Sequence, residues 1–260
     1  MYPNPGEPQV DLKSLPAGDI VAILRGQIRE LAQEGPIESV GAGFPGVIRG
    51  GVILESPNLG QLKLQLRYYQ CSKKYEEDVR TELAKARAWV EQRAGQVVNP
   101  AIVLDIDETS LSNWDQMVRN DFGFIENGAC DLDPRSACGQ RDWILSANGV
   151  AIAPTLELFK SAKARNVAVF FITGRYDDAV QRAATEFNLR KVGYLGWDGL
   201  FLRDPKTSGR PVSEYKTGAR MEIEKRGYTI IANVGDQESD LANGHAEKPF
   251  KVPNPFYFIP

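Results

Sequence analysis

The sequence predicts an α/β fold in three layers, with a doubly wound parallel sheet between two layers of helices. From Pro100 onward, short apolar runs of strand length alternate with longer stretches of helical period. Strands that alternate with helices pair in parallel, and the helices cover both faces of the sheet. With 260 residues, the chain can bury a full core as one large domain or as a domain with an insertion.

The first hundred residues lack this alternation. A proline-rich start is followed by residues 19–33, which have helical period, and by residues 35–51, which are too rich in glycine for a regular element. Residues 57–70 and 72–95 predict two helices. The second helix carries an apolar stripe formed by Tyr75, Val79, Leu83, Ala86 and Val90. We expect residues 1–98 to form an arm and a helical extension that packs on the core.

The core is expected over residues 99–260. Its expected strands are residues 101–106, 167–173, 199–203, 229–235 and 256–259, and its expected helices are residues 155–166, 177–189 and 213–227. About sixty residues separate the first two strand ends, which is far more than a crossover needs. We therefore expect an insertion at about residues 111–153.

Three acidic residues follow the first strand directly. Asp105, Asp107 and Glu108 are like charges, and each raises the cost of ionising the others unless a cation or a reaction uses them. Ligands of doubly wound sheets bind at the carboxyl ends of the strands. The further polar residues near those ends are Thr109, Thr173, Gly174, Arg175, Lys216, Asp236 and Asp240. We expect residues 173–175 to open a helix whose amides face an anion.

Four segments in this order resemble the haloacid dehalogenase (HAD) superfamily of phosphohydrolases: DIDET, FFITGR, YKTGAR and GDQESDL. Within it the chain is similar to the acid phosphatases related to bacterial class B and C enzymes and to plant vegetative storage proteins. DIDETSLSNW, PNPFYF and PNLGQLK also resemble that subfamily. The resemblance covers about residues 100–260. It implies a HAD-like doubly wound sheet in which the insertion forms a cap over the active site.

The resemblance also implies a reaction and the residues that perform it. A Mg²⁺-dependent acid phosphatase would hydrolyse phosphate monoesters through an aspartyl-phosphate on Asp105. Asp107 would first protonate the leaving group and then deprotonate the attacking water. Thr173 and Lys216 would hold the phosphoryl oxygens and balance their charge. Thr109, Gly174 and Arg175 would line the substrate site, Arg175 without a catalytic role.

The implied Mg²⁺ ligands are oxygen atoms from four acidic residues. Asp105 would bind through its carboxylate, Asp107 through its backbone carbonyl and Asp236 through its carboxylate, with Asp240 in the first or second coordination shell. Few protein ligands and several waters suit this hard cation. Structural interpretations stay open for single residues, because Thr173 and Asp240 also fit helix N-caps and Lys216 also fits a solvated lysine. A structural calcium loop starting at Asp236 fits poorly, since Leu241 stands where glycine is required.

Four aromatic residues of the insertion have two interpretations. Trp114, Phe122, Phe124 and Trp143 could stack on a nucleobase or an aryl leaving group, and Trp114 and Trp143 are our candidates for substrate contact. The same side chains could instead form a small core of the insertion itself.

Composition excludes several other chemistries. His245 is the single histidine of the chain, which is too few for histidine phosphatases or multi-histidine metal sites. The three cysteines lack the arginine six residues later that a cysteine phosphatase needs. A net charge of −3 argues against nucleic-acid polymers as partners, and no apolar run reaches the length of a membrane span. The expected partner is a small phosphate monoester, and a homodimer is left open.

The state of Cys130 and Cys138 indicates the type of cellular compartment in which the protein resides. A disulfide between them would indicate an oxidising environment, whereas two unpaired loop thiols would not. The first residues lack the build of a signal peptide. Relatives are often exported, so the resemblance favours a periplasmic or secreted protein over a cytoplasmic one. Two alternative functions also stay open: a non-enzymatic storage or binding protein on the same scaffold, and a phosphotransferase.

Overall fold

The computed structural model describes residues 47–49, 52–55, 57–130 and 137–259. It divides into two compact units, Met1–Pro57 and Asn58–Pro260. In the first unit, β1 (Val47–Arg49) pairs antiparallel with β2 (Val52–Glu55). This strand pair corrects the expectation of no regular element over residues 35–51. Its sequence is VIRGGVILE, and β-branched residues on both sides of a Gly-Gly pair favour a hairpin.

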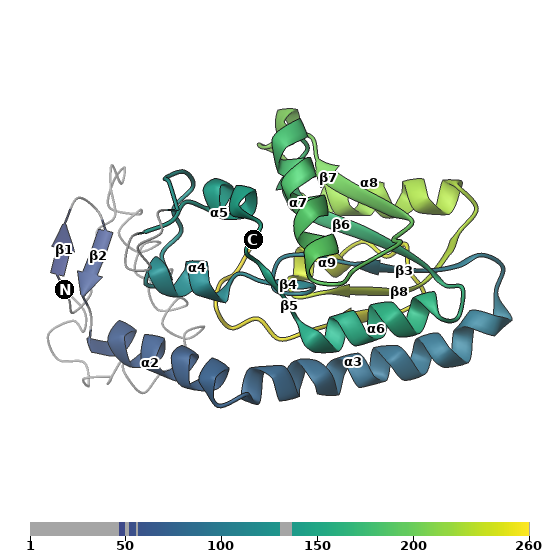
Figure 1. Ribbon diagram of the computed structural model, residues 1–260, viewed down its shortest axis with the longest axis horizontal. Coiled ribbons are helices and arrows are strands. Elements are labelled where there is room, and N and C mark those ends of the chain that lie inside the picture. The colour runs from purple at the N-terminus through teal and green to yellow at the C-terminus, as the bar shows by residue number, and fades with distance from the viewer. Residues whose placement is uncertain (1–46, 50–51, 56, 131–136, 260) are drawn as a thin grey trace, which may run out of the picture. The chain divides into compact units, whose positions relative to one another are not determined.

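The second unit is built on a five-stranded, wholly parallel sheet (Figure 1). Its strands in chain order are β3 (Pro100–Leu104), β6 (Ala168–Tyr176), β7 (Gly199–Arg203), β8 (Thr229–Gly235) and β9 (Pro249–Lys251). They lie in the order β7-β6-β3-β8-β9. The helices between them are α6 (Ala153–Lys163), α7 (Ala179–Lys191), η3 (Pro205–Thr207), α8 (Val212–Lys225) and α9 (Glu238–Leu241). The predicted α/β class with a parallel sheet is confirmed.

Successive residues of β3 point to opposite faces of the sheet, which gives the three layers. Ile102 and Leu104 belong to the core cluster shared with α6 and with α3 (Lys74–Arg93). Ala101 and Val103 belong to a second cluster on the other face, shared with α8. Strands buried on both faces read as continuous apolar runs, which is why AIVL shows no alternation.

Two helices precede the sheet, as predicted. They are α2 (Pro57–Cys71) and α3, and the short 3₁₀ turn η2 (Ala94–Gln96) follows α3. The buried residues of α3 are the predicted stripe Tyr75, Val79, Leu83, Ala86 and Val90. Trp89 of α3 also donates its indole N–H to the carbonyl of Ile231 in β8, at 2.7 Å. Helix α3 is therefore an integral part of the compact unit that contains the sheet.

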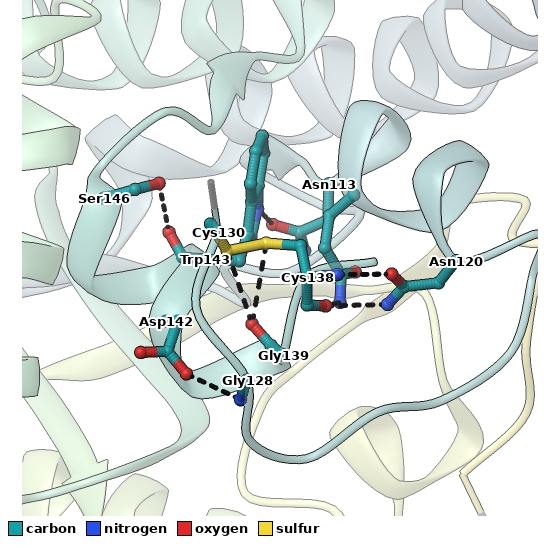
Figure 2. The surroundings of a disulfide bond; sticks show 10 residues. Asn113, Asn120, Gly128, Cys130, Cys138, Gly139, Asp142, Trp143 and Ser146 are labelled. Carbon is teal, nitrogen blue, oxygen red and sulfur yellow. Dashed lines mark hydrogen bonds between the residues drawn. A yellow bond between two sulfur atoms is a disulfide. The ribbon is translucent and has the colours of Figure 1, made fainter. Parts of the chain in front are cut away.

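An insertion between β3 and α6 lies beyond one end of the sheet (Figure 1). It contains β4 (Leu111–Ser112), α4 (Trp114–Arg119), α5 (Gln140–Ser146) and β5 (Val150–Ala151). Strands β4 and β5 pair antiparallel and close its base. Cys130 and Cys138 form a disulfide in front of α5, with 4.5 Å between their Cα atoms (Figure 2). The interpretation of these residues as two unpaired thiols is wrong.

The C-terminal segment differs from the prediction. Residues 256–259 were expected as a strand, but the last strand is β9 and the chain after it has no regular structure. Phe256 is buried against α3 and α4, whereas Phe258 is largely exposed. The expected helix at residues 19–33 lies outside the described residues. No helix in the described part of the chain is long and apolar enough to cross a membrane.

Candidate active site

The candidate site lies at the carboxyl ends of β3 and β8, the central pair of strands. The chain order of the strands reverses between these two, and in doubly wound sheets such a reversal opens a crevice for ligands. Asp105 directly follows β3, and its backbone N–H donates to the carbonyl of Val234 in β8, at 2.9 Å. Asp236 directly follows β8. The sheet pairing itself therefore brings two carboxylates from distant parts of the chain side by side.

Lys216, in the first turns of α8, bridges two of the acids. Its Nζ lies 2.5 Å from Asp105 Oδ1 and 2.5 Å from Asp240 Oδ1, and all three side chains are buried. Burial raises the pKa of Asp105 well above its usual range, although Lys216 opposes the shift. Burial lowers the pKa of Lys216, but the two carboxylates more than offset this and raise it overall. Lys216 is therefore a buried ammonium ion and not the solvated lysine of the alternative interpretation.

Asp236 is held by three neutral donors. Thr109 donates its hydroxyl to Asp236 Oδ1 at 2.8 Å, and the side-chain amides of Gln237 and Asn254 donate to Oδ2 at 2.6 and 2.8 Å. Burial and the neighbouring charge of Asp240 raise the pKa of Asp236. Thr109 is not among the described residues that line the cavity, and its observed contact is with Asp236.

Asp240 occupies the third position of α9 and not an N-cap. Its carboxylate accepts the backbone N–H of Gln237 at 2.8 Å, and the two residues form a capping box. Its backbone carbonyl is held from behind by Arg220, at 2.6 Å, and by Asn233, at 2.9 Å. The alternative in which Asp240 serves only as an N-cap is therefore wrong.

Asp105, Asp236 and Asp240 together fit a divalent cation. One carboxylate oxygen from each of these buried residues lies within 4.8 Å of the other two. The single ammonium of Lys216 cannot balance three ionised carboxylates, so a cation with two positive charges matches the remainder. All the donor atoms are oxygens, which suits a hard cation. Among the described acidic residues, Asp107 is not part of this cluster.

Asp107 is instead paired with Arg175. The guanidinium Nη2 lies 2.7 Å from Asp107 Oδ1 and Nε lies 3.1 Å from Oδ2, while Asn113 donates its amide to Oδ1 at 2.9 Å. Burial raises the pKa of Asp107, but the Arg175 charge and these hydrogen bonds outweigh burial and hold the pKa below its usual range. Asp107 is thus a carboxylate in the resting protein.

Thr173 differs from its prediction. Strand β6 continues through Tyr176, and α7 begins only at Ala179 with Asp178 as its N-cap. Residues 173–175 therefore lie in a strand, and both the expected helix start and the N-cap interpretation of Thr173 are wrong. The Thr173 hydroxyl lies 3.4 Å from Asp107 Oδ2 and accepts the N–H of Arg175 at 3.2 Å.

A cavity of about 650 Å³ opens over these residues. Its charged lining includes Asp105, Asp107, Arg175, Lys216, Asp236 and Asp240, and Gly174 lies beside them. Its apolar lining is Met117, Phe122, Phe124, Ile144, Val212, Phe256, Phe258 and Ile259. The insertion and the C-terminal segment thus face the charged floor from above.

Neither Trp114 nor Trp143, the two candidates for substrate contact, is among the described residues that line this cavity. Trp114 packs edge-on against Phe122, at 5.8 Å between ring centroids, and against Phe256 at 5.4 Å. Trp143 is buried, and its indole N–H donates to Asn113 Oδ1 at 2.8 Å. Both indoles belong to the packing of the insertion, whereas Phe122 and Phe124 face the cavity.

Three amide side chains that were not predicted as site residues each contact an acid of the site: Asn113, Gln237 and Asn254. All three lie inside quoted motifs, in DIDETSLSNW, GDQESDL and PNPFYF. Proximity to the acids of the same motif was the available signal for Asn113 and Gln237, whereas PNPFYF contains no acid. Their partners depend on side-chain directions that only the folded chain defines.

Comparison with known proteins agrees with this geometry. The model of the HAD superfamily, subfamily IIIB (acid phosphatase), matches residues 59–260. The chain is 34% identical over 160 residues to the stem 28 kDa glycoprotein of Glycine max, covering 60% of this chain and 59% of that protein. It is 30% identical over 158 residues to acid phosphatase 1 of Solanum lycopersicum, covering 60% and 58%. The matches thus span less than two thirds of those relatives' own lengths.

A solved structure shares the fold. The class C acid phosphatase from Bacillus anthracis superposes with a TM-score of 0.58 at 21% identity, covering 77% of this chain and 85% of that one. Vegetative storage protein 1 of Arabidopsis thaliana is 29% identical over 196 residues, covering 74% of this chain and 68% of that protein. The family match covers most of the chain, and on that ground the chain belongs to subfamily IIIB of the HAD superfamily, the acid phosphatase subfamily.

Proposed function

We propose that this protein hydrolyses phosphate monoesters with Asp105 as the nucleophile. The observation that carries this is the position of Asp105 on the charged floor of the cavity, 2.5 Å from the Lys216 ammonium and next to Asp236 and Asp240. A carboxylate that attacks a phosphate ester is repelled by the ester's own negative charge. A buried ammonium ion and a cation-binding acid cluster at the same point would offset that repulsion.

The reaction proceeds in two displacements. An oxygen of Asp105 attacks phosphorus, the ester oxygen leaves, and an aspartyl-phosphate forms. Water then attacks the phosphorus of this intermediate and releases inorganic phosphate and free Asp105. Lys216 stays beside the reacting carboxylate in both displacements. Gly174 and Arg175 line the cavity and would contact the phosphoryl oxygens, and Thr173 would contribute through its contact with Asp107.

Asp107 is the proton donor and acceptor of this mechanism. It protonates the leaving oxygen in the first displacement and takes a proton from water in the second, for about 10²–10⁴-fold in rate. The pairing with Arg175 favours the carboxylate form, which the second displacement needs. The first displacement needs the protonated form of Asp107, whose population rises as the pH falls. This requirement is consistent with an acid optimum.

The residues present fit Mg²⁺. Asp105, Asp236 and Asp240 would hold it through carboxylates, with the backbone carbonyl of Asp107 as a further ligand. When bound, Mg²⁺ supplies positive charge that neutralises the phosphoryl oxygens. The acid cluster lies on the cavity floor, where that charge is needed.

The cavity lining supports a substrate with an apolar or aromatic group beside its phosphate. Phe124 and Phe258 are largely exposed at the cavity, and Phe122 also lines it. Aromatic faces of this kind stack on nucleobases and on aryl groups. We therefore propose nucleotides or aryl phosphates as the substrate class, and the insertion as the cap over them.

An enzyme is favoured over a storage protein on this scaffold, because Asp105, Asp107 and Lys216 are all present and mutually arranged. Transfer of the phosphoryl group to an alcohol remains the alternative, and product analysis with added alcohols separates it from hydrolysis. The disulfide supports a periplasmic or secreted location, since disulfides persist in oxidising compartments. The homodimer stays a prediction that light scattering checks.

The test of the proposed function is an assay with p-nitrophenyl phosphate and Mg²⁺ at about pH 5 to about pH 7. The folded protein should release p-nitrophenol, and Asp105→Asn should release none while keeping the circular dichroism spectrum of the wild type. Failure of the folded wild type to turn over would reject the phosphatase. Wild-type activity in Asp105→Asn would reject the nucleophile.

A further inference from the structure

Trp143 and Asn113 form a buried contact between the insertion and the first-strand loop. The indole N–H of Trp143, in α5, donates to Asn113 Oδ1 at 2.8 Å, and the two side chains lie beside the disulfide in Figure 2. Trp143 is 4% exposed and Asn113 is 3% exposed. An indole N–H is a donor only, so the amide oxygen of Asn113 must face it. The amide nitrogen then points the other way.

That nitrogen faces two carboxylates. Asn113 Nδ2 donates to Asp107 Oδ1 at 2.9 Å and to Glu108 Oε2 at 3.0 Å. Glu108 is itself fixed by the backbone N–H of Asn113 and by the hydroxyl of Tyr257. A flipped amide would turn its oxygen toward the Asp107 carboxylate and leave the Trp143 N–H without an acceptor. The indole therefore selects the amide orientation that supports Asp107.

We propose that Trp143 is a positioning residue that acts through Asn113 on Asp107, which transfers protons to the leaving group. This inference rests on the proposed function, in which Asp107 is the proton donor. Asp107 Oδ1 receives both Asn113, at 2.9 Å, and Arg175 Nη2, at 2.7 Å. Asp107 Oδ2 has longer contacts, with Arg175 Nε at 3.1 Å and Thr173 at 3.4 Å. The less restrained Oδ2 is then the oxygen that carries the transferred proton.

The insertion holds the indole in place. The carbonyl of Cys138 accepts the side-chain amides of Gln116 and Asn120 from the α4 segment, at 3.1 and 2.7 Å, and its N–H donates back to Asn120 Oδ1 at 2.8 Å. The carbonyl of the next residue, Gly139, accepts the backbone N–H of Trp143 at 2.9 Å. The start of α5 is thereby tied to α4 and the disulfide. The position of the Asp107 side chain therefore depends, through Asn113 and Trp143, on the packing of the insertion.

Trp143→Phe tests this inference, because it keeps an aromatic ring and removes the N–H. Two substrates should be compared by kcat/KM, which reports the displacement in which the ester oxygen leaves. Phenyl phosphate has a strongly basic leaving group that needs the proton, and p-nitrophenyl phosphate has a weakly basic one that does not. We expect a loss of about 10-fold or more for phenyl phosphate and a loss below about 3-fold for p-nitrophenyl phosphate.

Asn113→Ala supplies an independent variant, because it removes the contact to Asp107 without altering α5. It should show the same selective loss, and Trp143→Phe should add little to it, since residues acting in one chain of contacts are not additive. Trp89→Phe is the matched control. It removes an indole hydrogen bond of similar length, to Ile231, away from the cavity, and should leave the ratio of the two substrates unchanged.

The outcomes separate this inference from the proposed function. If the wild type hydrolyses neither ester, the proposed function fails. If the wild type hydrolyses both, and folded Trp143→Phe and Asn113→Ala lose activity equally on both, the positioning role is rejected while the phosphatase stands. Independent, additive losses in the double variant would also reject it. Should Trp143→Phe not fold, the two-substrate ratio of Asn113→Ala alone decides.

Discussion

The guanidinium of Arg175 and the carboxylate of Asp107 form an ion pair at 2.7 Å, with the Arg175 side chain 2% exposed and Asp107 partly open to the cavity. The Asp105–Lys216 contact lies nearby. The pKa of Asp105 is raised, whereas the pKa of Asp107 is lowered. Two aspartates that are two positions apart in the sequence therefore have opposite electrostatic environments. Such divergence is typical of carboxylates with different roles in one reaction.

This contrast predicts stability changes of opposite sign for two isosteric variants. Asp107→Asn leaves the buried Arg175 without its charge partner and should lower the free energy of unfolding by about 1.5–3 kcal/mol. Asp105→Asn removes a charge whose ionised form burial disfavours. It should leave stability unchanged or raise it when divalent cations are absent. Urea unfolding of both variants in EDTA at neutral pH measures the free energy of unfolding. An equal loss of stability in Asp105→Asn and Asp107→Asn would contradict the prediction.

Gly235 predicts a steric effect at the site. A Cβ on this residue would lie 2.3 Å from Asp240 Cβ and 2.5 Å from Asp240 Oδ2. Gly235→Ala should therefore displace the carboxylate that holds Lys216, and lower kcat for p-nitrophenyl phosphate by about 10-fold or more.

Gly218→Ala is the matched control for Gly235→Ala. A Cβ on Gly218, inside α8, would meet no atom within 4 Å apart from the helix's own backbone. The substitution should raise stability by about 0.5–1 kcal/mol without changing kcat. Equal activity in the two alanine variants would show that the close packing of Gly235 on Asp240 is unimportant.

Asp178 predicts a pH-dependent contribution to stability. It caps α7 by accepting the N–H groups of Val180 and Gln181, and it pairs with Arg141 of α5 at 3.0 Å. The backbone and side-chain hydrogen bonds from Gln181 lower the pKa of Asp178 from 3.8 to about 2. The charge therefore stabilises the fold fully above about pH 4 and loses that effect as pH falls through about 2.

Asp178→Ala measures this contribution. It should cost about 1 kcal/mol near neutral pH, the typical value of an N-cap. The difference from the wild type should shrink as pH is lowered from about 4 toward about 2. Thermal unfolding across this range checks the sign, and a difference that grows on acidification would refute the assignment.

The disulfide between Cys130 and Cys138 predicts a mass and a stability change. On the chain-entropy model, closing so short a loop contributes about 2–3 kcal/mol. Reductant should add two hydrogens to the mass measured under denaturing conditions. It should also lower the midpoint of thermal unfolding of the folded protein. The Cys130→Ser/Cys138→Ser double variant should have that lower midpoint without reductant. An unchanged mass after reduction would show that the bond does not form.

Much of the fold follows from local patterns in the sequence. The stripe of α3 and the apolar runs of β3, β6, β7 and β8 were predictable because burial imposes a period on each element. The run at residues 256–259 was misread as a strand, since a short apolar run does not reveal whether its backbone pairs. Strand β9 has three residues and was missed, because so short a pairing leaves no periodic signal.

The site was predictable to the level of strand ends. Asp105, Lys216, Asp236 and Asp240 converge because parallel strands present their carboxyl ends at one edge. The partners of Thr109 and Trp143 were not predictable, because each depends on the direction of a side chain in the folded loop. Arg175 was expected to line the substrate site, but its pairing with Asp107 was not predictable, because β6 was not expected to continue through residue 176.

The most direct test of the central claim is to trap the phosphoryl group on Asp105. In Asp107→Asn, p-nitrophenyl phosphate should still form the intermediate, because its leaving group needs no proton, while hydrolysis lacks its base. Quenching with acid, reducing with borohydride and sequencing by mass spectrometry should find homoserine at position 105. Release of p-nitrophenol with an unmodified Asp105, or with the phosphoryl group on another residue, would contradict the account.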